Sequence, residues 1–145
     1  MRFLFSTIIF VTICLSSFAQ HSKWDIETNK DFIHATELFD QQKYAAAQKI
    51  FTELAEKHTD TDVQRESFYY MAVCGIRLFN SDAQKLLADF IRKYPESPRM
   101  FYAYFEMGNY LFREQKYADA LQWYARVDIR NFSNVDVADY FYKYA

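Results

Sequence analysis

Glycine and proline are scarce in this chain of 145 residues, which contains two of each. Gly75 and Gly108 stand alone, so the clustered glycines of a phosphate-binding loop are missing and nucleotide-binding folds built on such loops are excluded. Sandwiches and barrels of many short strands need frequent turn residues, which so few glycines and prolines do not supply. An all-helical fold is therefore expected.

Cysteine is equally rare, and basic and acidic residues are almost balanced. The chain has 17 basic and 19 acidic residues, a formal net charge of −2, without a clustered basic face, so nucleic acid is not an expected partner. One of the two cysteines, Cys14, lies in an N-terminal hydrophobic run. The other, Cys74, lies in an apolar helical stretch, where we expect a small buried residue rather than a reactive thiolate.

Residues 1–19 form a separate segment that is typical of a secretory signal peptide. Arg2 supplies the positive start, residues 3–18 carry no charge, and Ser17 and Ala19 are the small residues before the expected cleavage site. The apolar run is shorter than the roughly 20 residues of a membrane span, and no positive cluster follows it. We therefore expect cleavage after Ala19, export to the periplasm or outer membrane, and a mature chain without a membrane span.

Acylation of Cys14, as in a lipoprotein, is the less favoured alternative. The residue before it is Ile13, whereas lipoprotein signals resemble one another in having a small residue there. Residues 20–27 are expected to form a short N-terminal segment after the cleavage site.

The remaining sequence repeats about every 37 residues. One series of small residues marks a position where two helices must approach closely: Ala35, Ala72, Gly108 and Ala145. A second series of small residues keeps the same step: Ala47, Ala83 and Ala120. Bulky residues follow the second series by four and seven positions, on the same helical face: Phe51, Leu87 and Tyr124, then Leu54, Phe90 and Val127. Two series in register indicate a structural repeat rather than an ordinary helical bundle.

This register predicts three units of helix, turn and helix, over residues 31–57, 68–94 and 104–130. The turns are short and polar, at Gln42-Lys43, Asn80-Ser81 and Gln115-Lys116, so the paired helices must be antiparallel.

Helix starts are predicted from residues that favour N-terminal caps. Capping boxes are expected at Thr61-x-x-Gln64 and Ser81-x-x-Gln84, and Ser97 before Pro98 is expected as an N-cap. Gly108 is expected at the closest helix approach of the third unit, with alanine tolerated there because Ala35 and Ala72 hold the equivalent positions.

The third unit resembles a tetratricopeptide repeat in the order of its bulky, small and aromatic residues. The matching residues are Tyr104, Met107, Gly108, Leu111, Tyr117, Ala120, Tyr124 and Val127. The first two units match less completely, and the second has Gly75 where the family has an aromatic residue. The resemblance implies an all-α fold, with antiparallel helix pairs stacked as a right-handed solenoid over residues 28–136. Residues 137–145 then correspond to the start of a fourth, truncated repeat.

Repeat lengths above 34 and the Tyr-Pro-Glu-Ser-Pro sequence at 94–98 are similar to bacterial envelope members of this family, such as outer-membrane assembly and Tol-Pal-associated proteins. The resemblance implies a non-enzymatic scaffold for protein partners in the cell envelope. We expect no cofactor and no metal site, because His21, His34 and His58 lack any recognised ligand spacing. Self-association is expected through residues 137–145, whose aromatic side chains need a covering helix.

The resemblance further implies a binding groove lined by the first helices of the units. The candidate groove residues are Phe32, Tyr69, Arg77, Phe105, Asn109, Arg113 and Tyr142. Aromatic and arginine side chains contribute large contact areas and dominate binding hot spots. Packing between successive first helices explains the same rings equally well, so both interpretations stay open. Glycan or peptidoglycan binding by these rings is the alternative function.

Overall fold

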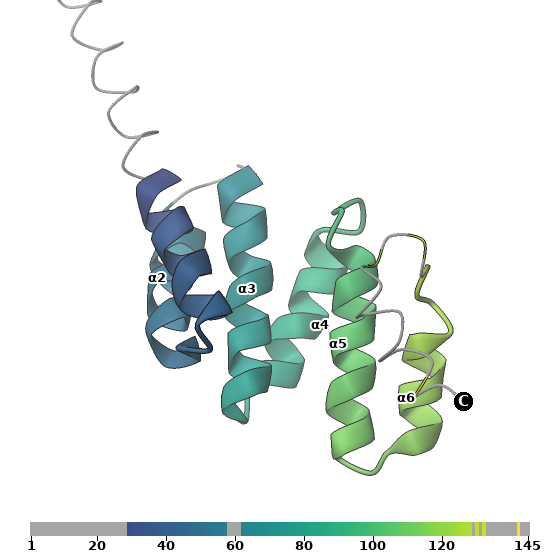
Figure 1. The fold of residues 1–145 in the computed structure, drawn as a ribbon. Helices are drawn as coiled ribbons and strands as arrows, with labels where there is room; N and C mark the ends of the chain where they lie inside the picture. The colour runs from purple at the N-terminus through teal and green to yellow at the C-terminus, as the bar shows by residue number, and fades with distance from the viewer. Residues whose placement is uncertain (1–28, 58–61, 129, 131, 133–141, 143–145) are drawn as a thin grey trace, which may run out of the picture.

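A computed structural model of the chain describes residues 29–57, 62–128, 130, 132 and 142. Within these residues the chain forms helices and short connections and no strand (Figure 1). The helices are residues 29–40, α2 (Tyr44–Lys57), α3 (Asp62–Leu78), α4 (Ala83–Lys93), α5 (Met100–Arg113) and α6 (Tyr117–Tyr124). Three predicted segments lie outside the described residues: the signal peptide, residues 20–27, and all of the fourth unit except Tyr142. The self-association expected through residues 137–145 is therefore not tested by the structure.

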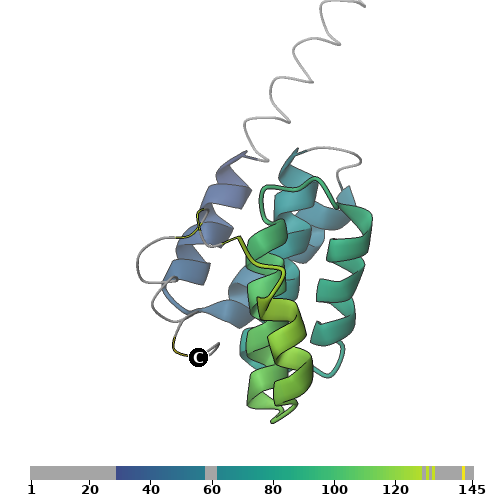
Figure 2. The same cartoon turned by 90° about the vertical axis from the view of Figure 1, so that its right-hand side faces the viewer.

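The helices form three antiparallel pairs that stack side by side. α3 contacts α2, α4 and α5, so the first helix of the second unit lies at the centre of the stack. In the view along the stack, helix 29–40 and α4 lie on opposite sides, with α5 and α6 in front of them (Figure 2). This arrangement confirms the expected all-α solenoid.

The small residues of both repeat series that the structure describes are buried where the paired helices meet. Ala35, Ala72, Ala47 and Ala83 have no exposed surface, and Ala120 is 1% exposed. The bulky residues that follow by four positions are also fully buried: Phe51, Leu87 and Tyr124. The periodicity in the sequence is therefore the periodicity of the core.

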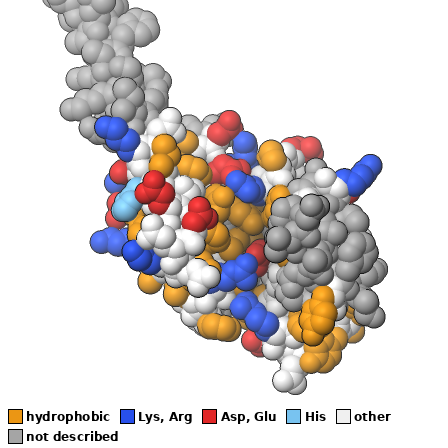
Figure 3. Space-filling view, in the orientation of Figure 1, with side chains coloured by type: hydrophobic (Ala, Val, Ile, Leu, Met, Phe, Trp, Pro, Cys, Tyr) orange, Lys and Arg blue, Asp and Glu red, His pale blue; other side chains and the backbone are white. Residues whose placement is uncertain are grey.

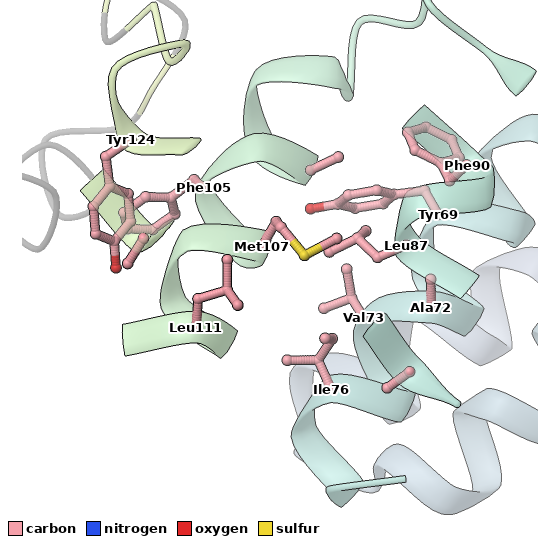
Figure 4. Close-up of a cluster of buried hydrophobic side chains, with 13 residues drawn as sticks. Tyr69, Ala72, Val73, Ile76, Leu87, Phe90, Phe105, Met107, Leu111 and Tyr124 are labelled. Carbon is pink, nitrogen blue, oxygen red and sulfur yellow. The ribbon is translucent and has the colours of Figure 1, made fainter. Parts of the chain in front are cut away.

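Two clusters of buried side chains hold the units together. The smaller cluster joins helix 29–40, α2 and α3 around Ala35, Phe51 and Cys74. The larger cluster joins α3 to α6, and in Figure 4 Met107 of α5 points towards Leu87, whereas Phe105 lies beside Tyr124. Because α3 contributes to both clusters, no unit has a core of its own, as expected for a repeat protein.

The three turns within the helix pairs share one backbone geometry. Each turn contains a residue with a positive φ of 60°, 59° or 61°: Gln42, Phe79 and Gln115, respectively. In the first turn the N–H of Gln42 donates to the carbonyl of Phe39, and that of Lys43 donates to the carbonyl of Leu38. Equivalent bonds close the other two turns. This is the Schellman arrangement, in which glycine is the usual residue at the left-handed position.

The helix starts differ in part from the sequence expectation. α4 begins after Asp82, which makes no side-chain capping bond, so the capping box expected at Ser81 is wrong. The Ser97 hydroxyl accepts a hydrogen bond from the N–H of Arg99, yet α5 begins only at Met100. Thr61 lies outside the described residues, so the capping box expected there stays a prediction. The Gln64 amide donates to the carbonyl of Ala55 at the end of α2.

The second helix of the third unit is shorter than the repeat register predicts. α6 ends at Tyr124, and the N–H groups of Arg126 and Val127 donate to carbonyls three residues back, which tightens the last turn. Just beyond, the Asp128 carboxylate accepts from the backbone N–H and the guanidinium of Arg130. A carboxylate that bonds the backbone in this way competes with continuation of the helix. Val127 still packs against the larger cluster, but from outside the helix.

Gly108 lies at the closest approach in the third unit, as predicted, but the expectation that alanine is tolerated there is wrong. A methyl group on Gly108 would overlap the ring of Tyr124, which is fully buried and closely surrounded. The equivalent bulky residue of the second unit is Leu87, which leaves room for Ala72. The position of the Tyr124 ring against Gly108 is therefore what favours glycine in the third unit.

We predict that Gly108→Ala lowers the free energy of unfolding by about 1 to 3 kcal/mol, because it overpacks a closed contact. Gly75→Ala is the matched control: its methyl group would meet Ala83 and Gln48 at 3.2 Å, and the gain in helix propensity offsets this tighter contact. Urea denaturation of both variants measures the difference.

A double-mutant cycle with Tyr124→Leu tests the cause. Removing the ring should make Gly108→Ala much less harmful, whereas additive effects would contradict the proposed overlap.

Candidate functional site

The first helices of the three units, residues 29–40, α3 and α5, form one surface of the stack, which we call the A-helix face. Phe32 and Phe39 contact the ring of Tyr70 on α3, with centroids 6.1 Å and 5.1 Å apart. α3 in turn contacts α5. The predicted groove residues all lie on these three helices except Tyr142, which is 83% exposed and whose neighbours lie outside the described residues.

Two residues of the aromatic series are packed inside the stack. Tyr69 and Phe105 are 6% and 5% exposed. The Tyr69 ring lies 5.5 Å from that of Phe90, and the Phe105 ring lies 5.3 Å from that of Phe132. Burial raises the pKa of Tyr69 well above its ordinary value. For these two positions the structure supports packing between helices, and neither ring offers a free face to a ligand.

Phe32 and Asn109 are also engaged within the chain. Phe32 is half-buried and lies edge-on to Phe51, with centroids 5.8 Å apart. Asn109 is buried, and its side-chain oxygen accepts a hydrogen bond of 2.8 Å from the Tyr124 hydroxyl. This bond fixes the ring that faces Gly108, so Asn109 positions the third unit's core.

Arg77 joins two neighbouring first helices. Its guanidinium lies 2.6 Å from the Glu106 carboxylate, whose side chain is 10% exposed. A pair so well shielded from water is screened less by salt than a surface pair. Arg77 therefore holds α3 against α5, and its charge is already matched within the chain.

Arg113 is the predicted groove residue with the most accessible charge. Its side chain is exposed, and one guanidinium nitrogen donates to the carbonyl of Ile76 at 3.2 Å. The guanidinium carbon lies 5.0 Å from the centre of the Phe79 ring. Arg113 is therefore placed beside an aromatic ring at the edge where α3 and α5 end.

Arg99, which no sequence pattern marks, forms the most extensive polar cluster of the A-helix face. Its guanidinium donates to Glu66 at 2.7 Å and to the Tyr70 hydroxyl at 3.1 Å. The rings of Tyr69, Tyr70 and Tyr102 lie within 6 Å of it. Burial also raises the pKa of Tyr70, so this hydroxyl stays protonated at neutral pH. Arg99 lies before α5 and outside the repeat positions, so periodicity gave no signal for it.

The exposed part of the A-helix face combines apolar and charged side chains. Figure 3 shows hydrophobic side chains gathered at its centre, next to helix 29–40, with acidic and basic side chains around them. Half-buried rings such as Phe39 and Tyr70 supply apolar surface, and Asp40 and Arg113 supply exposed charge. Such a mixture suits contact with another protein.

A cleft of about 490 Å³ opens between α2, α3 and α4. Its lining combines apolar and polar side chains: Gln48, Thr52, Ala55, Glu56, Phe68, Met71, Asn80, Asp82 and Leu86. Gln48 bridges the cleft, because its amide nitrogen donates to the carbonyl of Met71 and its oxygen accepts from Asn80. These bonds join the first and second units. The Gln48 side chain lies in the space that a side chain at position 75 would otherwise occupy.

Cys74 is fully buried within the smaller cluster. Burial raises the pKa of its thiol to about 12, although the nearby positive charge of Arg77 acts in the opposite direction. The thiol is therefore protonated at neutral pH, which agrees with a structural residue.

Among the described residues, no group of histidine, cysteine and acidic side chains is arranged to hold a metal ion. In the same part of the chain, none of the helices combines the length and hydropathy needed to cross a membrane.

Stacked antiparallel helix pairs with small residues at the repeated approach define an all-α solenoid of the tetratricopeptide type. The family model described as tetratricopeptide repeat matches residues 79–134, from the second turn through the third unit, and supports this family. A search of curated proteins finds no match. Repeats of this family generally mediate protein–protein interactions, and proteins built from them are generally non-enzymatic scaffolds.

The shifted pKa of Cys74 gives a pH-dependent prediction. In the unfolded chain the thiol ionises near its ordinary pKa of 9.0, whereas in the folded chain it ionises at about 12. Between these values the unfolded state binds fewer protons, so the free energy of unfolding falls as pH rises. We expect a loss of about 1 kcal/mol from this group between pH 8 and pH 10.

Urea titrations at the two pH values measure this loss, with Cys74→Ala as the control that removes the thiol. The variant should lose less stability over the same interval. Ionisation of Tyr69 in the unfolded chain lowers the stability of both proteins at higher pH, so it does not affect the comparison. An identical loss in both proteins would contradict the assignment to Cys74.

Proposed function

We propose that this chain is an exported scaffold of the bacterial cell envelope that binds partner proteins through its tandem helical repeats. The A-helix face is the proposed binding surface, and the catalytic step of any process it serves belongs to a partner. Residues 1–19 act as a cleaved signal peptide in this proposal.

The observation that carries the proposal is the match of residues 79–134 to a tetratricopeptide repeat, together with the exposed mixture of rings and charges on the A-helix face. Rigid helix pairs present such a surface at little entropic cost on binding. Export is supported by the uncharged run of residues 3–18 and the small residues before Gln20. The Tyr-Pro-Glu-Ser-Pro sequence supports the envelope type of the family.

Glycan binding is the weaker proposal. Sugar rings stack on exposed aromatic faces, but Tyr69 and Phe105 are buried against other rings. The half-buried Tyr70 ring is stacked on Phe51 at 4.9 Å and covered by Arg99 at 5.2 Å. The A-helix face is therefore better suited to a protein partner than to a sugar.

Export predicts a defined N-terminus. Expressed with its own residues 1–19 in a Gram-negative host, the protein should appear in the periplasmic fraction with Gln20 as its first residue. Intact mass measurement and N-terminal sequencing provide the test, and a version lacking residues 1–19 is the control that should remain in the cytoplasm. An uncleaved chain would contradict the proposal, and a lipid mass on Cys14 would show the lipoprotein alternative instead.

Binding through the A-helix face predicts a face-specific loss of partners. Glu37→Arg with Asp40→Arg alters exposed positions on this face, and Gln84→Arg with Ala88→Arg alters exposed positions on α4 as a matched control. We expect the first variant to recover several-fold less of each specific partner from envelope extract, measured by quantitative mass spectrometry. Equal recovery by wild type and both variants would contradict binding through this face, and quenching of tryptophan fluorescence by peptidoglycan fragments would favour the glycan proposal.

A further inference from the structure

Phe79 is a phenylalanine at a backbone position that disfavours it. Its φ of 59° lies in the left-handed region, where a bulky side chain is a genuine outlier. Gln42 and Gln115 occupy the same position of the other two turns, so the geometry belongs to the repeat, but the phenylalanine belongs to the second turn alone.

The Phe79 side chain also gains little from burial. It is 76% exposed, and it belongs to neither of the two clusters of buried residues. A glutamine, as in the other turns, would avoid the exposure of a large apolar ring, and glycine would also relieve the backbone. The position thus carries two unfavourable features that the fold does not require, which is characteristic of functional sites.

Arg113 places a positive charge beside the Phe79 ring. Its guanidinium carbon lies 5.0 Å from the ring centre, and its hydrogen bond to the Ile76 carbonyl fixes the guanidinium in place. Arg77 and Arg99 are neutralised by Glu106 and Glu66. Among the described residues no carboxylate lies within ion-pair distance of Arg113, and its side chain is exposed. A positioned guanidinium of this kind has donors available for a carboxylate.

We propose that Phe79 and Arg113 form a docking site for a partner segment in which a carboxylate side chain lies next to an apolar one. The carboxylate pairs with the Arg113 guanidinium, and the apolar side chain packs on the exposed ring of Phe79. The site rests on the proposed function as a protein scaffold, and it lies at the turn edge of the A-helix face rather than in its centre. Charge complementarity identifies the partner as acidic.

The site is tested with the purified full chain and two fluorescent peptides, one with glutamates flanking leucines and one with glutamines in place of the glutamates. Fluorescence anisotropy should show at least tenfold tighter binding of the glutamate peptide, with an advantage that shrinks at high salt. Equal binding of both peptides would overturn the proposal, as would binding to phosphatidylglycerol vesicles without binding to the peptide.

Phe79→Gly separates a binding role from a structural role. The glycine should raise Tm by about 3 to 6 °C, because it suits the left-handed turn, and should weaken binding of the glutamate peptide about tenfold or more. Gln115→Gly is the matched control, which should raise Tm similarly and leave binding unchanged. If Phe79→Gly binds the peptide as wild type does, the proposed site is wrong.

The arginine is tested in the same way. Arg113→Lys keeps the charge but loses the planar guanidinium, so it should weaken binding several-fold. Arg126→Lys is the control, because Arg126 is exposed and stacks on Trp123 at 4.4 Å outside the proposed site. If Phe79→Gly and Arg113→Lys recover the envelope partners at wild-type levels, the proposed site is wrong but the scaffold function stands. If the wild-type protein recovers no specific partner, the scaffold function itself is wrong.

Discussion

The close approach of two helices within each unit is the constraint on which this structure depends. A small residue of the first helix must face a bulky residue of the second, and the two volumes must fit together at the packing density of a protein interior. Ala72 is paired with Leu87, whereas Gly108 is paired with the larger Tyr124. In the first unit Ala35 lies in one cluster with the large ring of Phe51, so the placement of the bulky side chain, as well as its size, decides which small residue fits. The repeat keeps its spacing while its residues change.

The same constraint directs the aromatic residues inward. Rings such as Tyr69 and Phe105 fill the space between neighbouring helix pairs, because the small residues alone would leave that space empty. The surface that remains for partners is then defined less by the number of rings than by the few charged and aromatic groups at its margins. Arg99 is an example of a charged group that serves packing rather than binding. Three rings and Glu66 surround its guanidinium and leave little of it to a ligand.

Sequence periodicity predicted the helix pairs, their turns and the buried alanines, because each of these depends on spacing along one chain. It did not predict the end of α6 at Tyr124, after which the N–H groups of Arg126 and Val127 donate to carbonyls three residues back. It also misjudged Gly108, because the tolerance of that position depends on a ring sixteen positions away. The ion pair of Arg99 and Glu66 was not predicted for a similar reason. The two residues meet only when α5 lies beside α3, and no local sequence pattern indicates that contact.

The two junctions between units are built from different interactions. The first is joined mainly by rings and by the amide of Gln48, with Tyr70 in contact with Phe32, Phe39 and Phe51. The second adds two shielded ion pairs, Arg77 with Glu106 and Arg99 with Glu66, to its apolar contacts. Because these two carboxylates are largely shielded from water, salt screens the pairs less than it screens surface pairs. The junction between the second and third units therefore keeps its electrostatic contribution at ionic strengths that weaken exposed ion pairs.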